Sequence, residues 1–185
     1  LRGQMEEQGH QLRQLKQQSL ERYVDIDRRL SNGANAESVT QPGTATTSTT
    51  SPDIAEQPGE ADAYRSAYSL VRSQQFNDAV TTFRQFLQDY PAGKFAPNAH
   101  YWLGELFLVI VPPDLESSRR EFTLLLEQYP DNSKIPDALY KLGKVYFDKG
   151  NPEKAREYLD RVVKEYGSSG SSAVKLARDF ISQNY

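Results

Sequence analysis

One segment of this 185-residue chain occurs twice, and this recurrence limits the possible folds more than any other feature. The segment YPAGKFAPNAHYWLGELF at 90–107 aligns without gaps to YPDNSKIPDALYKLGKVY at 129–146, an offset of 39 residues with seven identical positions. Repetition at this spacing is typical of proteins built from stacked copies of one small unit, because a single copy cannot bury its own apolar face. We therefore expect a stack of similar units over residues 61–185.

Each copy has the pattern of two helices joined by a tight turn. The small and apolar residues of the last complete copy recur at helical spacing: Leu139, Leu142, Gly143 and Tyr146, then Ala155, Leu159 and Val162. Between the two runs, Gly150 tolerates the positive φ found past a helix end, Asn151 is a good N-cap, and Pro152 suits the first turn of the next helix. We expect Gly143 to face Ala155, so that the two helix backbones approach closely.

These positions resemble those of the tetratricopeptide repeat, a hairpin of two helices with about 34 residues. The first and second copies share most of the same small and apolar positions: Ala67, Leu70, Ala79, Phe83 and Pro91, then Leu103, Gly104, Phe107, Ser118, Phe122 and Pro130. The second copy departs from the pattern by two extra residues in the turn at 109–116, and three extra residues separate the repeats at 94–96 and 133–135. The resemblance implies an all-α fold in which residues 61–185 form an α-solenoid of three hairpins, with a capping helix at 171–183.

The first 60 residues differ in composition from the repeats. Residues 31–60 consist mainly of Ser, Thr, Pro, Gly, Ala, Asn and Gln, and only Val39 and Ile54 are large and apolar. Because so few side chains can be buried, folding of this stretch cannot offset the loss of about 1–2 kcal/mol of backbone entropy per residue. We predict a disordered linker over 31–60.

Residues 1–30 are predicted to form a coiled-coil oligomerisation helix. They contain no proline, and the candidate seam residues step by 3, 4, 4, 3 and 4 positions: Leu12, Leu15, Ser19, Tyr23, Ile26 and Leu30. A helix with so thin an apolar stripe is not stable alone in water, so we expect self-association. The alternative is a partly helical tail, and the spacing by itself leaves dimer and trimer open.

The first helices of stacked hairpins form a concave wall, which is lined by side chains that point away from the partner helix. Alignment of the three copies predicts three equivalent positions per repeat as a partner groove: Tyr64, Tyr68, Val71, Tyr101, Glu105, Leu108, Tyr140, Lys144 and Phe147. A tyrosine recurs at the first of these positions, and its ring offers flat apolar area with a hydroxyl for capture of a peptide segment. The alternative is that the tyrosines fill gaps between adjacent hairpins.

Composition and motifs exclude several functions. The net charge of −3 is opposite to the basic excess of nucleic-acid binders, and the absence of cysteine excludes disulfides and thiolate metal sites. No apolar run reaches the length of about 18 residues that a membrane span needs. The two histidines, His10 and His100, lie in different zones without metal-ligand spacing, and we expect both at the surface. We therefore predict a non-enzyme with no catalytic residue, no metal site and no cofactor.

The order of the parts and three motifs resemble the periplasmic accessory proteins of the Tol-Pal system. The motifs are the seam at 12–30, above all YVDIDRRL at 23–30, the stretch at 61–67, and PDALYKLG at 136–143. The resemblance implies a periplasmic, non-catalytic adaptor with a trimeric coiled coil, whose partners are TolA and a class A penicillin-binding protein, a peptidoglycan synthase. It further implies a role in coordinating cell-wall synthesis with outer-membrane constriction during cell division.

The sequence also bears on how the chain begins and on two other functional classes. Because the chain begins with Leu1 rather than Met, we expect that an upstream segment was removed, and the sequence leaves open whether this was a signal peptide. A generic tetratricopeptide scaffold or cytosolic co-chaperone would also bind a peptide segment in the groove. A carboxylate clamp needs Lys, Asn and Arg side chains, however, where this chain offers tyrosines and Lys144. A cell-wall hydrolase would need acid and base residues in an arrangement that the sequence does not supply.

Overall fold

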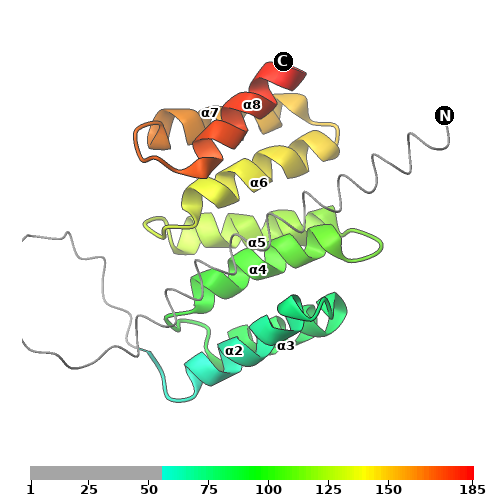
Figure 1. The fold of residues 1–185 in the computed structure, drawn as a ribbon, viewed down its shortest axis with the longest axis vertical. Helices are drawn as coiled ribbons and strands as arrows, with labels where there is room; N and C mark the ends of the chain where they lie inside the picture. The colour runs from blue at the N-terminus through cyan, green and yellow to red at the C-terminus, as the bar shows by residue number, and fades with distance from the viewer. Residues whose placement is uncertain (1–55) are drawn as a thin grey trace, which may run out of the picture. The chain divides into compact units, whose positions relative to one another are not determined.

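The structure is a computed structural model and describes residues 56–185 of the chain. This part contains seven helices and no strand, as Figure 1 shows: α2 (Glu60–Arg72), α3 (Phe76–Asp89), α4 (Ala96–Val109), α5 (Leu115–Gln128), α6 (Ile135–Asp148), α7 (Pro152–Tyr166) and α8 (Ser172–Asn184). The all-α fold predicted from the sequence is therefore confirmed for these residues. The predictions for residues 1–55, which include the coiled-coil seam and most of the linker, lie outside the described residues.

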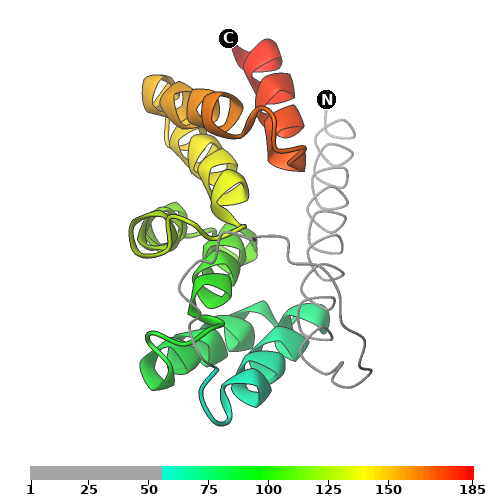
Figure 2. The ribbon, with the colours of Figure 1, turned by 90° about the vertical axis from the view of Figure 1, so that its left-hand side faces the viewer.

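The seven helices form three hairpins and one terminal helix. Helices α2 and α3, α4 and α5, and α6 and α7 pack as pairs, and α8 packs against both α6 and α7. Each second helix also contacts the first helix that follows it, so the apolar core continues from one hairpin to the next. In Figures 1 and 2 the first helices α2, α4 and α6 form one layer, and the second helices α3, α5 and α7 form the other. The solenoid of three hairpins is thus observed, with α8 as the predicted capping helix.

The turn between α6 and α7 has the conformation predicted from its sequence. Gly150 adopts a φ of +74°, which glycine accepts without steric cost. The side chain of Asn151 accepts a hydrogen bond from the backbone N–H of Lys154 at 3.0 Å, and Pro152 is the first residue of α7. This cap satisfies one of the N–H groups that a helix start leaves without an internal partner.

Two glycines let the helices of a hairpin approach closely. A Cβ atom at Gly143 would lie 2.8 Å from Cγ of Leu159 and 3.3 Å from the carbonyl oxygen of Ala155, so the predicted contact between Gly143 and Ala155 is confirmed. At the equivalent Gly104, a Cβ atom would lie 2.6 Å from the ring of Phe122. A side chain at either position would therefore push the second helix away from the first.

The second hairpin has the longer turn that its sequence predicts. Five residues, 110–114, join α4 to α5, whereas three residues, 73–75 or 149–151, join the helices of the other two hairpins. The difference equals the two extra residues found by aligning the copies. The tip of this turn is in solvent, with Val111 91% exposed.

The repeat domain includes residues that composition alone assigns to the linker. Glu60 is the first residue of α2 and is fully buried. Its carboxylate accepts hydrogen bonds from the backbone N–H groups of Gln57 and Phe95. The structure thus joins residues 57–60 to the first hairpin through contacts that a count of apolar residues does not detect.

Candidate partner-binding site

Tyr64, the first residue of the predicted groove, lies in the core. Its ring stacks on Phe95 with centroids 5.0 Å apart, and it meets Phe83 and Phe86 edge-on at 5.7 and 5.8 Å. Phe83 and Phe86 belong to α3, whereas Phe95 is the N-cap of α4. Tyr64 therefore joins the first hairpin to the second, and only 4% of the residue is exposed.

Tyr101 occupies the same place one repeat later. Its ring lies edge-on to Phe122 of α5 at 5.7 Å, and the ammonium group of Lys134 lies 5.4 Å from the centre of its ring. Lys134 is the N-cap of α6, as Phe95 is the N-cap of α4. The groove assignment of Tyr64 and Tyr101 is therefore corrected. Their rings pack between successive hairpins, as the alternative interpretation predicted, because this side of each first helix points toward the next repeat.

The last position of each predicted set lies two turns beyond the tyrosine and points the same way. Val71 is 1% exposed, so its assignment to an open groove is also corrected. Leu108 is half-buried. Phe147 lies edge-on to Phe180 of α8, with centroids 5.2 Å apart, and so helps to hold the terminal helix.

The middle positions lie further from the second-helix layer. They are Tyr68, Glu105 and Lys144, and each is about 40° further round its helix than the preceding tyrosine. The ring of Tyr68 stacks parallel to Tyr64 at 6.3 Å. The ammonium group of Lys144 lies 6.0 Å from the ring of Phe180, at the α8 end of the stack. Of these three, Tyr68 and Lys144 are half-buried, and Glu105 is buried.

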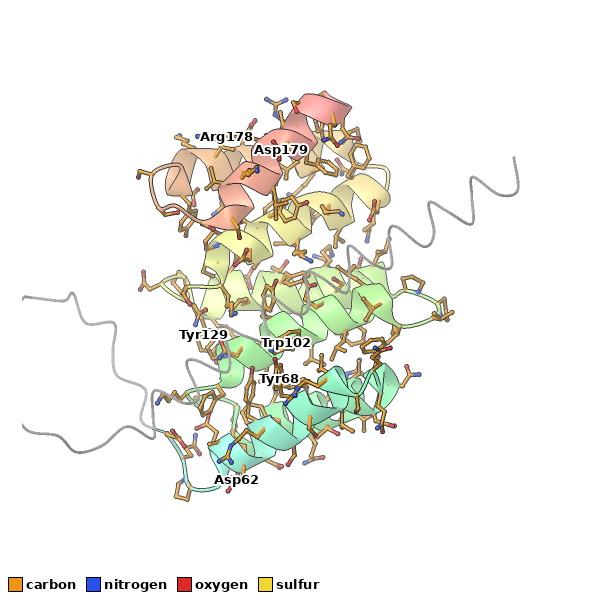
Figure 3. All side chains as sticks on the ribbon, in the orientation of Figure 1. Asp62, Tyr68, Trp102, Tyr129, Arg178 and Asp179 are labelled. Carbon is orange, nitrogen blue, oxygen red and sulfur yellow. The ribbon has the colours of Figure 1, made fainter. Side chains whose placement is uncertain are left out.

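Two further residues, which alignment of the copies missed, contact these positions: Trp102, which is 1% exposed, and Lys141, which is half-buried. The indole of Trp102 lies 5.4 Å from the ring of Tyr68, and Figure 3 shows the two residues side by side. Lys141 of α6 reaches Glu105 of α4 across two hairpins, with 2.7 Å between Nζ and Oε2. Trp102 precedes Glu105 by three residues, so a helical wheel would have found it. We name this group of residues the first-helix face and define it by Tyr68, Trp102, Glu105, Lys141 and Lys144, of which Trp102 and Glu105 are buried.

Glu105 is a nearly buried carboxylate within the first-helix face, with 5% of the residue exposed. Its Oε2 accepts a hydrogen bond from Lys141, whose side chain is 14% exposed. Its Oε1 is buried and has no hydrogen-bond partner among residues 56–185. An unsatisfied buried polar atom costs about 1–3 kcal/mol, so this oxygen lowers the stability that the ion pair provides.

Tyr140 of α6 lies close to the carboxylate of Glu105. Burial of the phenol, followed by the negative charges of Glu105 and Asp179, raises the pKa of Tyr140 to about 12. The phenol therefore stays neutral at physiological pH and acts as a polar packing group. The prediction of Tyr140 as a partner contact has no direct support in its position, which is half-buried.

A second buried pair joins the helices of the middle hairpin. His100 Nδ1 lies 2.8 Å from Oε2 of Glu121, and their side chains are 10% and 13% exposed. The expectation that His100 lies at the surface is therefore wrong, because α4 turns the imidazole toward α5. The pair links two helices of one hairpin and serves their packing.

A surface cleft of about 340 Å³ lies between the second helices α5 and α7. Thr123, Leu126, Tyr158, Arg161 and Tyr166 are among its lining residues. Burial raises the pKa of Tyr158 and of Tyr166 above the ordinary value of a phenol. No residue of the predicted groove lines this cleft.

Two observations bear on other kinds of site. Within residues 56–185, no group of three His, Cys, Asp or Glu side chains is arranged to hold a metal ion. In the same range, no helix has the length and apolar character needed to cross a bilayer.

Comparison with protein families and solved structures identifies the fold. Models of the tetratricopeptide repeat match residues 64–133 and 137–169. The crystal structure of the Sgt2 TPR domain from Aspergillus fumigatus superposes with a TM-score of 0.56 at 18% identity, covering 71% of this chain and 82% of that one. The described residues therefore form a tetratricopeptide-repeat domain.

The particular relatives are cell division proteins. Cell division coordinator CpoB of Pseudomonas putida is 34% identical over 123 residues, which cover 57% of this chain and 46% of that protein. The CpoB of Escherichia coli K12 is 34% identical over 117 residues, which cover 57% of this chain and 44% of that protein. The chain thus spans about half the length of the curated relatives it matches. A family model described as TolA binding protein trimerisation matches residues 1–40. The predicted resemblance to the Tol-Pal accessory proteins, and to CpoB in particular, is confirmed.

Proposed function

We propose that this chain is a non-catalytic periplasmic adaptor of the Tol-Pal system that acts in cell division. The observation that carries the proposal is the presence of both matches in one chain. The repeat domain is similar to Cell division coordinator CpoB, and residues 1–40 match the family of TolA-binding trimerisation segments. The proposed partners are TolA and a class A penicillin-binding protein that synthesises peptidoglycan. Through them the chain would coordinate cell-wall synthesis with outer-membrane constriction.

The proposed assembly is a trimer held by the seam of residues 1–30. Three repeat domains on one stalk would raise the effective concentration of binding faces, so that weak individual contacts combine. The proposed linker at 31–60 would let two or three domains engage one partner assembly. This division of the chain into stalk, linker and repeat domain follows the sequence prediction.

The first-helix face supports the proposal of an adaptor. Tyr68 and Lys144 are half-buried and would be the members of this face that meet a peptide segment, whereas Trp102 and Glu105 are buried. The buried carboxylates of this region are already engaged, Glu105 in an ion pair with Lys141 and Glu121 in a hydrogen bond with His100. That use favours a binding surface over an acid–base centre.

A general scaffold or co-chaperone that binds carboxylate termini has weaker support. Such a clamp needs several cationic side chains free to meet the guest. Here Lys141 is already bonded to Glu105, and Lys144 lies over the ring of Phe180. The tetratricopeptide similarity to the Sgt2 domain, at 18% identity, concerns the fold alone.

Titration calorimetry with purified TolA tests the proposal. The full chain is expected to bind TolA, and light scattering is expected to show a trimer. Deletion of residues 1–30 is expected to give a monomer in which each repeat domain still melts cooperatively. Absence of TolA binding by the full chain would refute the proposed role, and an oligomer after the deletion would refute the stalk.

A further inference from the structure

The junction between the second helices α5 and α7 is open where the preceding junction is bridged. Tyr129, the C-cap of α5, donates a hydrogen bond from its hydroxyl to the carbonyl oxygen of Pro91 at 3.3 Å. One repeat later, allowing for the shorter turn before α7, the equivalent residues are Tyr166 and Pro130. In the described part of the chain no hydrogen bond joins these two, and both line the cleft of about 340 Å³.

A shorter side chain removes a second bridge from the same junction. Arg84 of α3 places its guanidinium over the ring of Phe107 in α4, 5.1 Å from the ring centre. The residue at the equivalent position of α5 is Thr123, which lines the cleft and is too short for such a contact. The cleft therefore extends from Thr123 to Pro130, about 10 Å along α5.

The cleft carries an excess of negative charge. Two carboxylates, Glu127 and Glu165, line it together with one cation, Arg161. The Nε of Arg161 donates a hydrogen bond to Oε1 of Glu165 at 3.0 Å, so these two charges balance each other. The carboxylate of Glu127 is exposed and has no counter-charge left among the lining residues. Because complementary charge selects the partner of a surface, the cleft favours a cationic guest.

The remaining lining favours arginine as the cation. Tyr158 and Tyr166 are half-buried, so part of each ring faces the cleft, and Leu126 and the buried Ile135 add apolar surface. A long apolar stem that ends in a planar charged group matches such a lining. Arginine also has five N–H donors, enough for a carboxylate and for the carbonyl oxygen of Pro130, whereas lysine presents a compact point charge.

We infer that the cleft between α5 and α7 binds an arginine side chain of a partner protein, with the guanidinium group paired to Glu127. None of the lining residues belongs to the first-helix face. The inference goes beyond the proposed function, because it specifies the chemical group that is bound and not the protein that carries it. A repeat domain with a binding surface on each helix layer would be able to hold two partners at once.

NMR of labelled methyl groups in the full chain tests the inference, with a blocked pentapeptide of one arginine among alanines as the probe. The methyl signals of Thr123, Leu126 and Ile135 are expected to shift, because these residues line the cleft. The same peptide with citrulline, the neutral isostere of arginine, is expected to bind about fivefold more weakly, because it forms no ion pair. Equal binding of the two peptides would overturn the inference, as would the absence of shifts at these methyl groups.

A pair of charge variants locates the site. Glu127→Gln removes the uncompensated carboxylate and is expected to weaken binding of the arginine peptide about fivefold. Glu157→Gln is the control, since this exposed carboxylate on α7 lies near Tyr158 but does not line the cleft. It is expected to change the affinity less than about twofold. Equal affinities of the two variants would overturn the inference while leaving the proposed function intact.

A second pair fills the cleft from within. Thr123→Arg places an arginine where the preceding junction has Arg84, and it is expected to weaken binding of the arginine peptide about fivefold or more by occupying the cleft. Thr81→Arg makes the same change at an exposed position of α3 and is expected to leave the affinity within about twofold. Circular dichroism melts confirm that both variants are folded. Undiminished binding by folded Thr123→Arg would place the arginine outside this cleft and overturn the inference.

Discussion

Glu60 Oε1 accepts a hydrogen bond from the backbone N–H of Phe95 at 2.7 Å, which joins the start of α2 to the start of α4. The other oxygen accepts one from the N–H of Gln57 at 2.9 Å. Gly93 lies against this carboxylate, where a side chain would have no room. The contact sets the spacing of the first two hairpins at one edge of the stack.

Glu60→Gln is expected to lower the free energy of unfolding by about 1–3 kcal/mol, because the amide replaces one acceptor oxygen with a donor and leaves a buried N–H unpaired. Urea unfolding followed by circular dichroism measures the change. Asp62→Asn is the control, since its carboxylate is in the same turn, is 79% exposed and pairs with the exposed Arg65. It is expected to cost less than about 1 kcal/mol. Equal losses for both variants would contradict the role given to Glu60.

Gly143→Leu is expected to cost at least about 1–3 kcal/mol of stability, because even a Cβ atom there would lie 2.8 Å from Leu159 Cγ. Thermal melting of the full chain measures the loss. Asp148→Leu, at an exposed position on the same helix, is the matched control and is expected to leave Tm nearly unchanged. A Tm that stays constant for Gly143→Leu would show that the two helices do not meet at this position.

Tyr101→Ala is expected to destabilise the domain by about 3–5 kcal/mol, because the ring is fully buried against Phe122. Tyr68→Ala removes a half-buried ring and is expected to cost only about 1–2 kcal/mol. Denaturant unfolding compares the two variants. An equal or smaller loss of unfolding free energy for Tyr101→Ala would refute the packing of Tyr101 between hairpins. It would instead support the assignment of Tyr101 to the partner groove.

Tyr140 predicts a loss of stability at alkaline pH. Burial, then Glu105 and Asp179, raise its pKa to about 12 in the folded chain, whereas an unfolded phenol titrates near 10. Its contribution is therefore fully present below about pH 10 and is lost as the pH rises through about 12.

Comparison with Tyr140→Phe isolates this effect from that of the other buried tyrosines. The urea midpoint of the wild type is expected to fall more steeply over this pH range than that of the variant. The difference spectrum of the two proteins is expected to show a phenol that ionises late. Parallel pH profiles would contradict the raised pKa.

The helices and turns could be predicted because they depend on nearby residues. Gly150, Asn151 and Pro152 specify the turn between α6 and α7 through their own backbone preferences. The contact of Gly143 with Ala155 also follows from helical spacing within one hairpin. Composition places residues 57–60 in the linker, because it does not reveal that Glu60 bonds to a loop 35 positions away.

The candidate site could be predicted only in part. Alignment placed Tyr68, Glu105 and Lys144 on the outer side of the first helices, but it placed Tyr64, Val71 and Tyr101 there as well. The alignment shows which residues of the three repeats correspond to one another. The exposure of those residues depends on how each hairpin is rotated against the next. The N-cap residues Phe95 and Lys134 decide this, since they lie on the rings of Tyr64 and Tyr101.

The amino-acid sequence by itself determined that this chain contains repeated helical hairpins, where the turn between the helices of the third hairpin lies, and which protein family it resembles. These properties arise from periodicity and backbone preference, which act over a few residues. Only the tertiary structure decided which side chains remain available to a partner. The pairs Glu105–Lys141 and His100–Glu121 form because packing brings separate helices together, and this long-range geometry has no local signature in the sequence.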